Sequence, residues 1–465
     1  MSASHSELMI GVSGIRGVVG TALSPGKALA FVQAYATWLK RHAERPKVLL
    51  ARDTRPTGEM MRHAVLSGLL ASGCEVIDLD IVATPTLQLS IPRLEADGAI
   101  CITASHNPVE WNALKFFQPN GMYIDKAMGA DVLEIYHARS FSCNGWEEMG
   151  SVTTNTDAVG FHLQKVLSLV DVDKIRQRKF KVVLDCCSGA GTTISPQLLD
   201  ALGCEVIPLH CDLTGRFPHN PEPLNKNLTE LCQAVPAHGA DVGFAHDADA
   251  DRVALVTNDG TAIGEDYALV WSVAHTLKNR KRGPVVTNLS TSMAVDAVAK
   301  QYDCEVSRTP VGDINVSSKM KAIGAVIGGE GNGGVIIPDI QYGRDGMATL
   351  AYLLEFIAES GTSAAALSAT IPRFANIKST IDFPREKTTE LLIWLKVKEK
   401  NVRIDERDGI KFEWPQNGDT QSWAHIRPSG TEPFVRLIVE AQTEAEAQRI
   451  ESSFRKEMEA FAEGW

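Results

Sequence analysis

Gly73-Cys74-Glu75-Val76-Ile77 occurs again as Gly203-Cys204-Glu205-Val206-Ile207 and, with a changed first residue, as Asp303-Cys304-Glu305-Val306. In each place the segment follows an apolar strand, a polar loop and an apolar run with helical spacing. In each place a further apolar strand comes later and ends in an unusual polar loop. Three copies with one order of elements indicate an internal duplication.

The repeated order of strand, helix, strand and strand predicts three similar α/β domains, each with a mixed or parallel sheet. Ligands of open α/β sheets bind beyond the carboxyl ends of the strands. The candidate functional loops of the three copies are therefore residues 103–107, 247–252 and 329–334.

The C-terminal part follows another plan. Apolar and polar residues alternate in 434–439, which predicts a strand. Thr443 with Glu446 forms a capping box that opens a final helix. A chain of 465 residues also exceeds what one hydrophobic core supports. We therefore expect four domains, the last of them α+β, at residues 1–150, 151–257, 258–370 and 371–465.

Composition restricts the class of protein. The net charge of −11 disfavours nucleic acid and anionic membranes as partners. No segment reaches the roughly 20 apolar residues of a transmembrane helix, and residues 1–10 lack the features of a secretory signal. Nine cysteines without a CxxC pair argue against a disulfide framework and a zinc site. We expect a soluble, cytoplasmic protein with reduced thiols.

Asp247, Asp249 and Asp251 occupy alternate positions of one loop. Three carboxylates in this pattern can converge on one hard cation, and oxygen ligands suit Mg²⁺. A solvated acidic turn is the structural alternative, whereas the glycine and late glutamate of an EF-hand loop are absent. A phosphatase with an aspartate nucleophile is the competing function. Apolar segments on both sides place the loop at the rim of a sheet, which favours a metal site.

Ser105 lies in Thr103-Ala104-Ser105-His106-Asn107-Pro108, directly after an apolar strand. A serine at a strand end can act as a nucleophile or carry a phosphate. No GxSxG elbow surrounds Ser105, and adjacent residues such as Ser105 and His106 rarely meet in the geometry of a serine hydrolase. The alternative without chemistry is a serine that only caps the following Asn-Pro turn.

The glycine-rich loop 329–334 has the chemistry of a sugar site. Its glycines let a ligand approach the backbone, and Glu330 and Asn332 can hydrogen-bond a neutral polyol such as a sugar ring. A dinucleotide is the weaker interpretation, because Glu330 would repel a pyrophosphate.

The segment that begins at Arg427 supplies what a phosphate needs. Arg427 can bind a phosphate as a fork, and Ser429 and Thr431 offer hydroxyl groups. Gly430 allows backbone N–H groups to turn inward as an anion nest, and Arg436 adds charge nearby. An ordinary turn is the alternative, since Pro-Ser-Gly is common in turns.

The four loops lie in four predicted domains. Each domain contributes one function: a nucleophile, a metal site, a loop that binds a polyol, and a loop that binds a phosphate. This arrangement predicts a single central cleft for a small phosphorylated sugar. Five basic residues would make that cleft positive on an acidic protein: Arg16, Lys115, Arg252, Arg427 and Arg436.

Together these motifs resemble those of the α-D-phosphohexomutases, the family of phosphoglucomutases, phosphomannomutases and phosphoglucosamine mutases. The similarity covers essentially the whole chain and includes residues 11–17, residues 52–55 and all four loops in order. It implies three similar α/β domains and a C-terminal domain like TATA-binding protein, around one central cleft. It also implies an isomerase of carbohydrate metabolism, with one Mg²⁺ per chain and a phosphorylated serine.

Matching positions imply a role for each candidate residue. Ser105 would be the phosphoserine, and one of its phosphate oxygens would bind Mg²⁺ together with the three aspartates of the 247–252 loop. Around it, the catalytic residues would be Arg16, Arg252 and Lys115, with Lys115 a candidate for proton transfer. The substrate-binding residues would be Glu330 and Asn332 for the sugar, and Arg427, Ser429, Gly430, Thr431 and Arg436 for the non-reacting phosphate.

The implied reaction passes a phosphoryl group from phosphoserine to the free 1- or 6-hydroxyl of a hexose phosphate. The resulting 1,6-bisphosphate then reorients in the site, and the phosphoryl group from its other end is transferred to the dephosphorylated Ser105. A hexose 1,6-bisphosphate would therefore activate the dephosphorylated protein, and closure of the fourth domain would exclude water. The expected partner is a small phosphosugar, and the chain is expected as a monomer or homodimer.

Four positions depart from common family patterns. Ala248 and Ala113 occupy places where glycine is usual, and alanine is tolerable at 248 if its φ is negative. Asn332 replaces a serine and Gly334 a histidine, so no basic role of that histidine can be transferred to this chain.

The sugar loop and the later Tyr342-Gly343-Arg344-Asp345-Gly346 resemble one branch of the family. That branch is often assigned as archaeal-type phosphoglucosamine mutase or as dual phosphoglucomutase/phosphomannomutase. Glucosamine phosphate is therefore the first substrate hypothesis, with glucose and mannose phosphates open. A metal-dependent sugar phosphatase and a non-catalytic phosphosugar sensor are the alternative functions.

Overall fold

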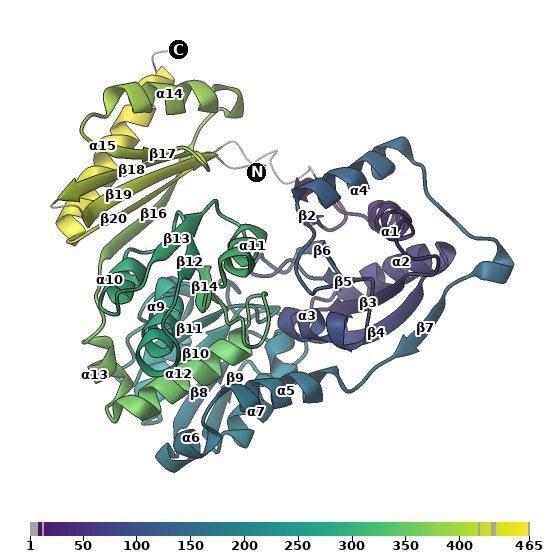
Figure 1. The fold of residues 1–465 in the computed structure, drawn as a ribbon, viewed down its shortest axis with the longest axis horizontal. Helices are drawn as coiled ribbons and strands as arrows, with labels where there is room; N and C mark the ends of the chain where they lie inside the picture. The colour runs from purple at the N-terminus through teal and green to yellow at the C-terminus, as the bar shows by residue number, and fades with distance from the viewer. Residues whose placement is uncertain (1–7, 12–13, 417–418, 429–433, 464–465) are drawn as a thin grey trace. The chain divides into compact units, whose positions relative to one another are not determined.

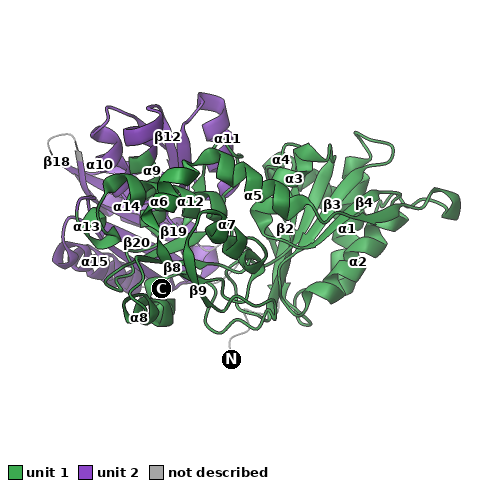
Figure 2. Ribbon diagram, turned by 90° about the horizontal axis from the view of Figure 1, so that it is seen from below, with its two compact units in different colours: residues 1–275, 332–369 green, residues 276–331, 370–465 purple. Residues whose placement is uncertain are grey.

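The structure is a computed structural model that describes residues 8–11, 14–416, 419–428 and 434–463 (Figure 1). Its strands form four sheets, which follow one another along the chain. Residues 1–275 and 332–369 form one compact unit, and residues 276–331 and 370–465 form a second (Figure 2).

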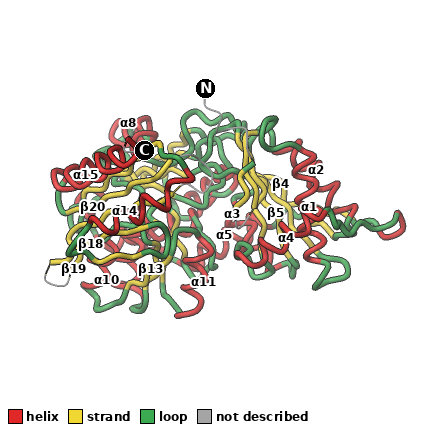
Figure 3. Tube along the Cα trace, turned by 90° about the horizontal axis from the view of Figure 1, so that it is seen from above, coloured by secondary structure: helices red, strands yellow, loops and turns green. Residues whose placement is uncertain are grey.

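The first sheet has seven strands and is mixed. Its order is β1-β2-β6-β5-β3-β4-β7, in which β5, β3, β4 and β7 run parallel and β6 runs antiparallel to both of its neighbours. Helices α1, α2 and α4 cover one face and α3 packs on the other, so the central strands are buried between two helical layers, whereas the edge strand β7 is exposed (Figure 3). The bounds are β1 Met9–Gly11, β2 Gly14–Val18, α1 Pro25–Leu39, β3 Lys47–Arg52, α2 Gly58–Ala71, β4 Glu75–Ile81, α3 Thr84–Arg93, β5 Gly98–Ile102, β6 Trp111–Phe117, α4 Lys126–Ala138 and β7 Ser151–Thr154.

The second and third sheets repeat the strand order of the first. Their orders are β11-β10-β8-β9 and β15-β14-β12-β13, which match β6-β5-β3-β4 strand for strand. Each repeated Cys-Glu-Val segment lies at the start of the second strand of its copy, β4, β9 or β13. The predicted triplication of a mixed α/β domain is therefore confirmed.

The elements of these two copies have the following bounds. The second comprises α5 Ala158–Leu169, α6 Val172–Arg178, β8 Lys181–Asp185, α7 Ser195–Ala201, β9 Glu205–Leu209, α8 Thr229–Ala237, β10 Val242–His246 and β11 Val253–Thr257. The third comprises α9 Asp266–His275, β12 Val285–Asn288, α10 Ala294–Lys300, β13 Val306–Thr309, α11 Asp313–Ile323, β14 Ile327–Glu330, β15 Gly334–Ile336, α12 Gly346–Ser360 and α13 Ala364–Ser368.

The C-terminal domain is an antiparallel sheet with two helices. The strand order is β16-β20-β19-β18-β17, and every neighbouring pair is antiparallel. The Thr443 hydroxyl accepts a bond from the Glu446 N–H at 3.3 Å, as the capping box predicted. This confirms a distinct fourth domain, and its narrower likeness to TATA-binding protein stays a prediction. The bounds are β16 Ala375–Asp382, α14 Thr388–Lys398, β17 Arg403–Asp405, β18 Ile410–Gln416, β19 Asp419–Pro428, β20 Phe434–Ala441 and α15 Glu444–Glu463.

The fold brings candidate loops to the carboxyl ends of buried strands. Strand β5 ends three residues before Ser105, β10 ends directly before Asp247, and β14 ends on Glu330. Among the described residues, no helix has the length and apolar character to cross a membrane. All nine cysteines are free thiols.

Candidate active site

Ser105 lies at a sharp turn that follows β5. Its φ is +50°, and its side chain is 2% exposed. The hydroxyl donates to Asp247 Oδ2 at 2.7 Å and lies 3.3 Å from His106 Nδ1. Neighbouring side chains point to opposite faces only in an extended strand, and the left-handed turn removes that separation. Ser105 and His106 therefore contact each other although they are adjacent in sequence.

The turn of Ser105 is held by Arg55, which sequence reasoning had placed only in a family motif. Its guanidinium donates to the carbonyl oxygens of Ser105 and Asn107, both at 2.7 Å. Arg55 also pairs with Asp53 at 3.0 Å, and both side chains are completely buried. Asp53 in turn accepts the Thr103 hydroxyl at 2.6 Å. The segment 52–55 is thus the scaffold of the serine turn.

The acidic loop has the geometry of a cation site. Carboxylate oxygens of Asp247, Asp249 and Asp251 lie within 4.8 Å of one another, and at most 1% of each residue is exposed. Oδ1 of Asp249 and Oδ1 of Asp251 are buried and accept no hydrogen bond from the described residues. Buried polar atoms are rarely left without a partner, so these oxygens fit a hard cation.

The alanines of this loop take different conformations. Ala250 has a φ of +54°, whereas Ala248 is not among the described non-glycine residues with positive φ. The condition under which alanine is tolerable at 248 is therefore met.

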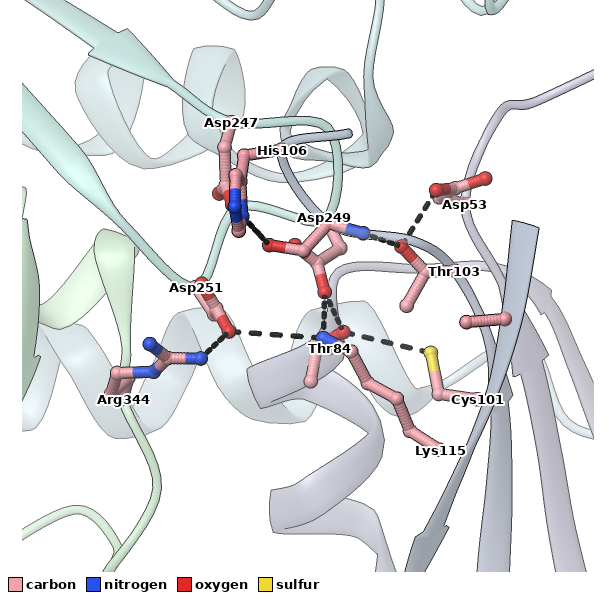
Figure 4. Close-up of polar contacts among 12 residues, drawn as sticks. Asp53, Thr84, Cys101, Thr103, His106, Lys115, Asp247, Asp249, Asp251 and Arg344 are labelled. Atoms are coloured by element: carbon pink, nitrogen blue, oxygen red, sulfur yellow. Dashed lines mark hydrogen bonds and ion pairs between the residues drawn. The ribbon is translucent and has the colours of Figure 1, made fainter. Parts of the chain in front are cut away.

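Cationic side chains contact the acidic loop, and Figure 4 shows two of them, Lys115 and Arg344. Lys115 Nζ lies 2.6 Å from Asp249 Oδ2 and 3.9 Å from Asp251 Oδ2, so a residue of β6 reaches the loop after β10. Arg252 Nε lies 3.8 Å from Asp247 Oδ2 and 3.7 Å from Asp251 Oδ1. These pairs place two of the predicted catalytic residues beside the three aspartates.

Arg16 is connected to the serine loop by another route. Its Nη1 donates to Asn107 Oδ1 at 2.7 Å. Strand pairing sets Arg16 opposite Ala113, two residues before Lys115 in β6. The structure therefore brings together Ser105, Arg16, Lys115, Arg252 and the three aspartates, all within the first compact unit.

Burial and neighbouring charges shift the pKa values of Asp247, Asp249 and His106 in different directions. Burial, and then Asp251 and Asp249, raise the pKa of Asp247 well above its usual range. Burial also acts on Asp249, but Lys115 and the Thr84 hydroxyl outweigh it and lower its pKa. Burial with Arg252 and Arg16 holds the pKa of His106 well below its usual value, so the imidazole is neutral at pH 7.

Glu330 and the phosphate loop belong to the second compact unit. Glu330 Oε1 accepts bonds from Asn288 Nδ2 and from the Gly312 N–H, both at 2.9 Å. Arg427 Nε lies 2.8 Å from an oxygen of Asp408, a carboxylate that also accepts the Val311 N–H at 2.9 Å.

The remaining predicted substrate residues have these places. In the first unit, Asn332 Oδ1 accepts the Gly334 N–H at 3.2 Å. Arg436 is exposed and lies 5.8 Å from the ring of Phe434. Ser429, Gly430 and Thr431 lie outside the described residues.

Two residues of the site were missed as functional candidates. Thr84, at the start of α3, donates its hydroxyl to Asp249 Oδ2 at 2.7 Å. Arg344, part of the segment 342–346 that resembles one family branch, donates to Asp251 Oδ2 at 2.6 Å. Only the polar motif around Arg344 carried any signal, because a lone threonine at a helix start is ordinary capping chemistry.

A second group of side chains has the chemistry of metal ligands: Asp185, His210 and His219. His219 Nε2, however, bonds Asp185 at 2.9 Å, and His210 Nε2 bonds Glu230 at 3.0 Å. These contacts satisfy the group as two histidine–carboxylate hydrogen bonds, and we assign no metal to it.

Four family models match the chain in sequence. They describe domains I, II and III and the C-terminal domain of phosphoglucomutase/phosphomannomutase, and they match residues 7–142, 161–260, 265–374 and 380–457. The chain therefore belongs to the α-D-phosphohexomutase family. It is a phosphohexomutase, an isomerase of carbohydrate metabolism.

Named relatives agree with this assignment. A Thermococcus kodakarensis protein named "Phosphoglucomutase/phosphomannomutase" is 37% identical over 444 residues, which cover 95% of this chain and 96% of that protein. A Methanopyrus kandleri protein named "Probable phosphoglucosamine mutase" is 36% identical and covers 96% of each chain. A solved phosphoglucomutase/phosphomannomutase family protein from Burkholderia thailandensis superposes with a TM-score of 0.84 at 26% identity, covering 99% of this chain and 98% of the other.

Proposed function

We propose that this phosphohexomutase interconverts the 1- and 6-phosphates of a hexose through a phosphoserine at Ser105 and a 1,6-bisphosphate intermediate. Glucosamine phosphate is the first substrate hypothesis, and glucose and mannose phosphates are the others. The names of the relatives support this range of substrates, because they cover glucose, mannose and glucosamine phosphates.

The observation that carries the proposal is the 2.7 Å bond from the Ser105 hydroxyl to Asp247 Oδ2. It joins the end of one sheet to the end of the next. A phosphoryl group on Ser105 would therefore lie against the acidic loop, where a cation can neutralise its oxygens.

The cation is proposed to be Mg²⁺, held by Asp247, Asp249 and Asp251 with an oxygen of the phosphoserine. When bound, it supplies positive charge to the oxygens of the transferring phosphoryl group. Support comes from the two buried carboxylate oxygens that no described group hydrogen-bonds.

Each transfer breaks the bond between phosphorus and one oxygen and forms a bond to another. In the first step the serine Oγ leaves and takes up a proton, while the sugar hydroxyl gives up its proton as it becomes a phosphate ester, so the net transfer of one proton is from the sugar hydroxyl to Ser105. We propose that Lys115, Arg16 and Arg252 stabilise charge on the phosphoryl oxygens. Lys115 is also the proposed proton donor to the departing Ser105 Oγ, since an ammonium group has protons to give.

The glycine-rich loop 329–334 and the segment that begins at Arg427 are proposed to hold the rest of the substrate. Glu330 and Asn332 would bond sugar hydroxyls, and Arg427 with Ser429, Gly430, Thr431 and Arg436 would bind the non-reacting phosphate. We also propose a cytoplasmic location, which nine free thiols support, and a monomer or homodimer in solution.

Replacement of the nucleophile tests the proposal. Ser105→Ala removes the only group proposed to store the phosphoryl, so we expect interconversion of glucosamine 1- and 6-phosphates to be lost. Ser67→Ala, at an exposed serine of α2, is the matched control and should retain full activity. Near-normal turnover by Ser105→Ala would contradict the phosphoserine mechanism. Values of kcat/KM for glucosamine, glucose and mannose 1-phosphates on the unmodified protein decide the substrate.

A further inference from the structure

Asp251 lies between two cationic side chains, Arg344 and Lys115 (Figure 4). Arg344 Nη2 is 2.6 Å from Asp251 Oδ2, and Lys115 Nζ is 3.9 Å from the same oxygen. Arg344 is 8% exposed and Asp251 is 1% exposed, so little water competes with their contact. The other oxygen, Asp251 Oδ1, accepts no hydrogen bond from the described residues.

The backbone that carries Arg344 is fixed from both sides. Arg344 forms a bridge with Ile336, the last residue of β15. Asp345 then caps helix α12, with Oδ1 accepting the N–H groups of Met347 and Ala348 at 3.1 and 3.0 Å. Its Oδ2 bonds the buried His162 at 2.9 Å. Arg344 therefore extends from a rigid anchor toward the acidic loop.

The same segment also bonds the backbone of the acidic loop. The N–H of Gly346 donates to the carbonyl of Ala250 at 3.2 Å. The start of α12 and the acidic loop are thus connected both by a backbone hydrogen bond and by the Arg344–Asp251 pair.

Gly334 leaves room for the stem of Arg344, by which we mean the aliphatic part of its side chain. A Cβ added there would lie 2.2 Å from Arg344 Cδ and 3.1 Å from Arg344 Cγ. The φ of Gly334 lies outside the region that excludes L side chains. The stem of Arg344, and not backbone strain, therefore requires glycine at position 334.

We propose that Arg344 is a positioning residue for Asp251, and that Gly334 is kept without a side chain to admit its stem. By holding Oδ2, Arg344 leaves Oδ1 available to the cation and keeps the carboxylate from closing on Lys115. The inference rests on the proposed metal site. Partners that orient a metal ligand typically change metal affinity about 10–100-fold when they are removed.

Binding of Mn²⁺, followed by electron paramagnetic resonance on the purified full chain, tests this without an activity measurement. We expect Arg344→Ala to raise the Kd for Mn²⁺ about 10–100-fold. Arg344→Lys keeps a charge that can reach Asp251 and should restore part of the affinity. Gly334→Ala should mimic Arg344→Ala, because the new methyl group displaces the stem.

A double-mutant cycle distinguishes positioning from a general loss of structure. In the Arg344→Ala background the stem is gone, so Gly334→Ala should have little further effect on the Kd. Gly68→Ala is the control, since its Cβ would lie 2.9 Å from Val32 Cγ1 in the α1–α2 contact, away from the acidic loop. It should lower the melting temperature and leave the Kd unchanged.

The possible results separate failure of the positioning role from failure of the proposed metal site. Unchanged or tighter Mn²⁺ binding by Arg344→Ala and Gly334→Ala, beside normal binding by the unmodified protein, overturns the positioning role alone. Additive losses in the double variant overturn the link between Gly334 and Arg344. Absence of Mn²⁺ binding by the unmodified protein overturns the proposed metal site, and this inference with it.

Discussion

Lys115 and Asp249 are 134 residues apart in the chain and 2.6 Å apart in the structure. The pair connects β6 of the first domain to the acidic loop of the second, and both side chains are buried. Thr84 bonds the same carboxylate oxygen from helix α3. The serine loop and the acidic loop are therefore parts of one hydrogen-bonded assembly, and its members can be tested singly.

Removal of Lys115 should make folding depend on metal. Lys115→Met leaves Asp249 buried without its cationic partner, which typically costs about 3–5 kcal/mol. We expect the loss of unfolding free energy in urea to be largest without Mg²⁺ and to be partly recovered when Mg²⁺ is added. Lys396→Met removes an exposed pair with Glu406 and should change little in either condition. Equal losses with and without Mg²⁺ would count against a cation in the acidic loop.

Gly14 should be more sensitive to substitution than Gly20. At Gly14 a Cβ would lie 1.9 Å from the Leu114 carbonyl oxygen, in the β2–β6 pairing that carries Arg16 and Lys115. Gly20 has a φ of +93° but no atom within 4 Å of the added Cβ. Gly20→Ala should therefore cost about 1–3 kcal/mol of backbone strain alone. Gly14→Ala should cost more and should also lower kcat, as thermal melting and turnover assays would measure; similar effects of the two would refute the argument.

The phosphate role of Arg427 predicts a change in KM. Arg427→Ala should weaken phosphosugar binding by about 2–4 kcal/mol, as expected for loss of one partner of a charged contact. Arg407→Ala is a suitable control, because Arg407 is a half-exposed neighbour that pairs with Asp405. An unchanged KM in Arg427→Ala, measured with saturating Mg²⁺, would show that this segment does not bind the phosphate.

A hexose bisphosphate should start turnover of dephosphorylated protein. Phosphatase treatment would leave Ser105 without the phosphoryl group that it must donate in the first step. Added glucose 1,6-bisphosphate should restore activity and label Ser105, as mass spectrometry of the tryptic peptide would detect. Steady release of inorganic phosphate as the main product would instead indicate a phosphatase.

His219 predicts a dependence of stability on pH. Burial opposes its charge, but bonds to Asp185 and Cys187 outweigh burial and raise the pKa of His219 to about 11. An unfolded histidine titrates near pH 6.5, so the stabilisation is complete below about pH 6.5 and declines as pH rises toward 11.

The variant that isolates this effect is His219→Gln. Between pH 6.5 and 9.5 the unmodified protein should lose less than about 1.4 kcal/mol of unfolding free energy per pH unit through this group. The variant should show a flatter dependence in urea titrations at several pH values. His63→Gln, at an exposed histidine beside Glu59, should leave the dependence unchanged.

Periodicity and repetition in the sequence predicted most of the fold. The Cys-Glu-Val repeat anticipated a strand order that recurs in three sheets, because each copy carries the same elements in the same sequence. The aspartates could be predicted because all three stand in one loop. Arg344 could not, since 93 residues separate it from Asp251 and only folding brings α12 to the acidic loop. The contact between His106 and Ser105 could not be predicted either, because it depends on a φ of +50° at Ser105 that sequence patterns do not specify.

The bonds that tie Ser105 and its neighbours to the acidic loop have a consequence for substrate choice. The bonds Ser105–Asp247, Lys115–Asp249 and Thr84–Asp249 fix Ser105, the proposed phosphoryl donor, at one point, so it has little freedom to travel between the two ends of a hexose. In the proposed mechanism the two half-reactions would then use two poses of one sugar, with its hydroxyl groups exchanged in space. Side chains that tolerate both poses can discriminate only weakly between epimers. Because the proposed donor is fixed, we therefore expect the protein to accept several hexose phosphates.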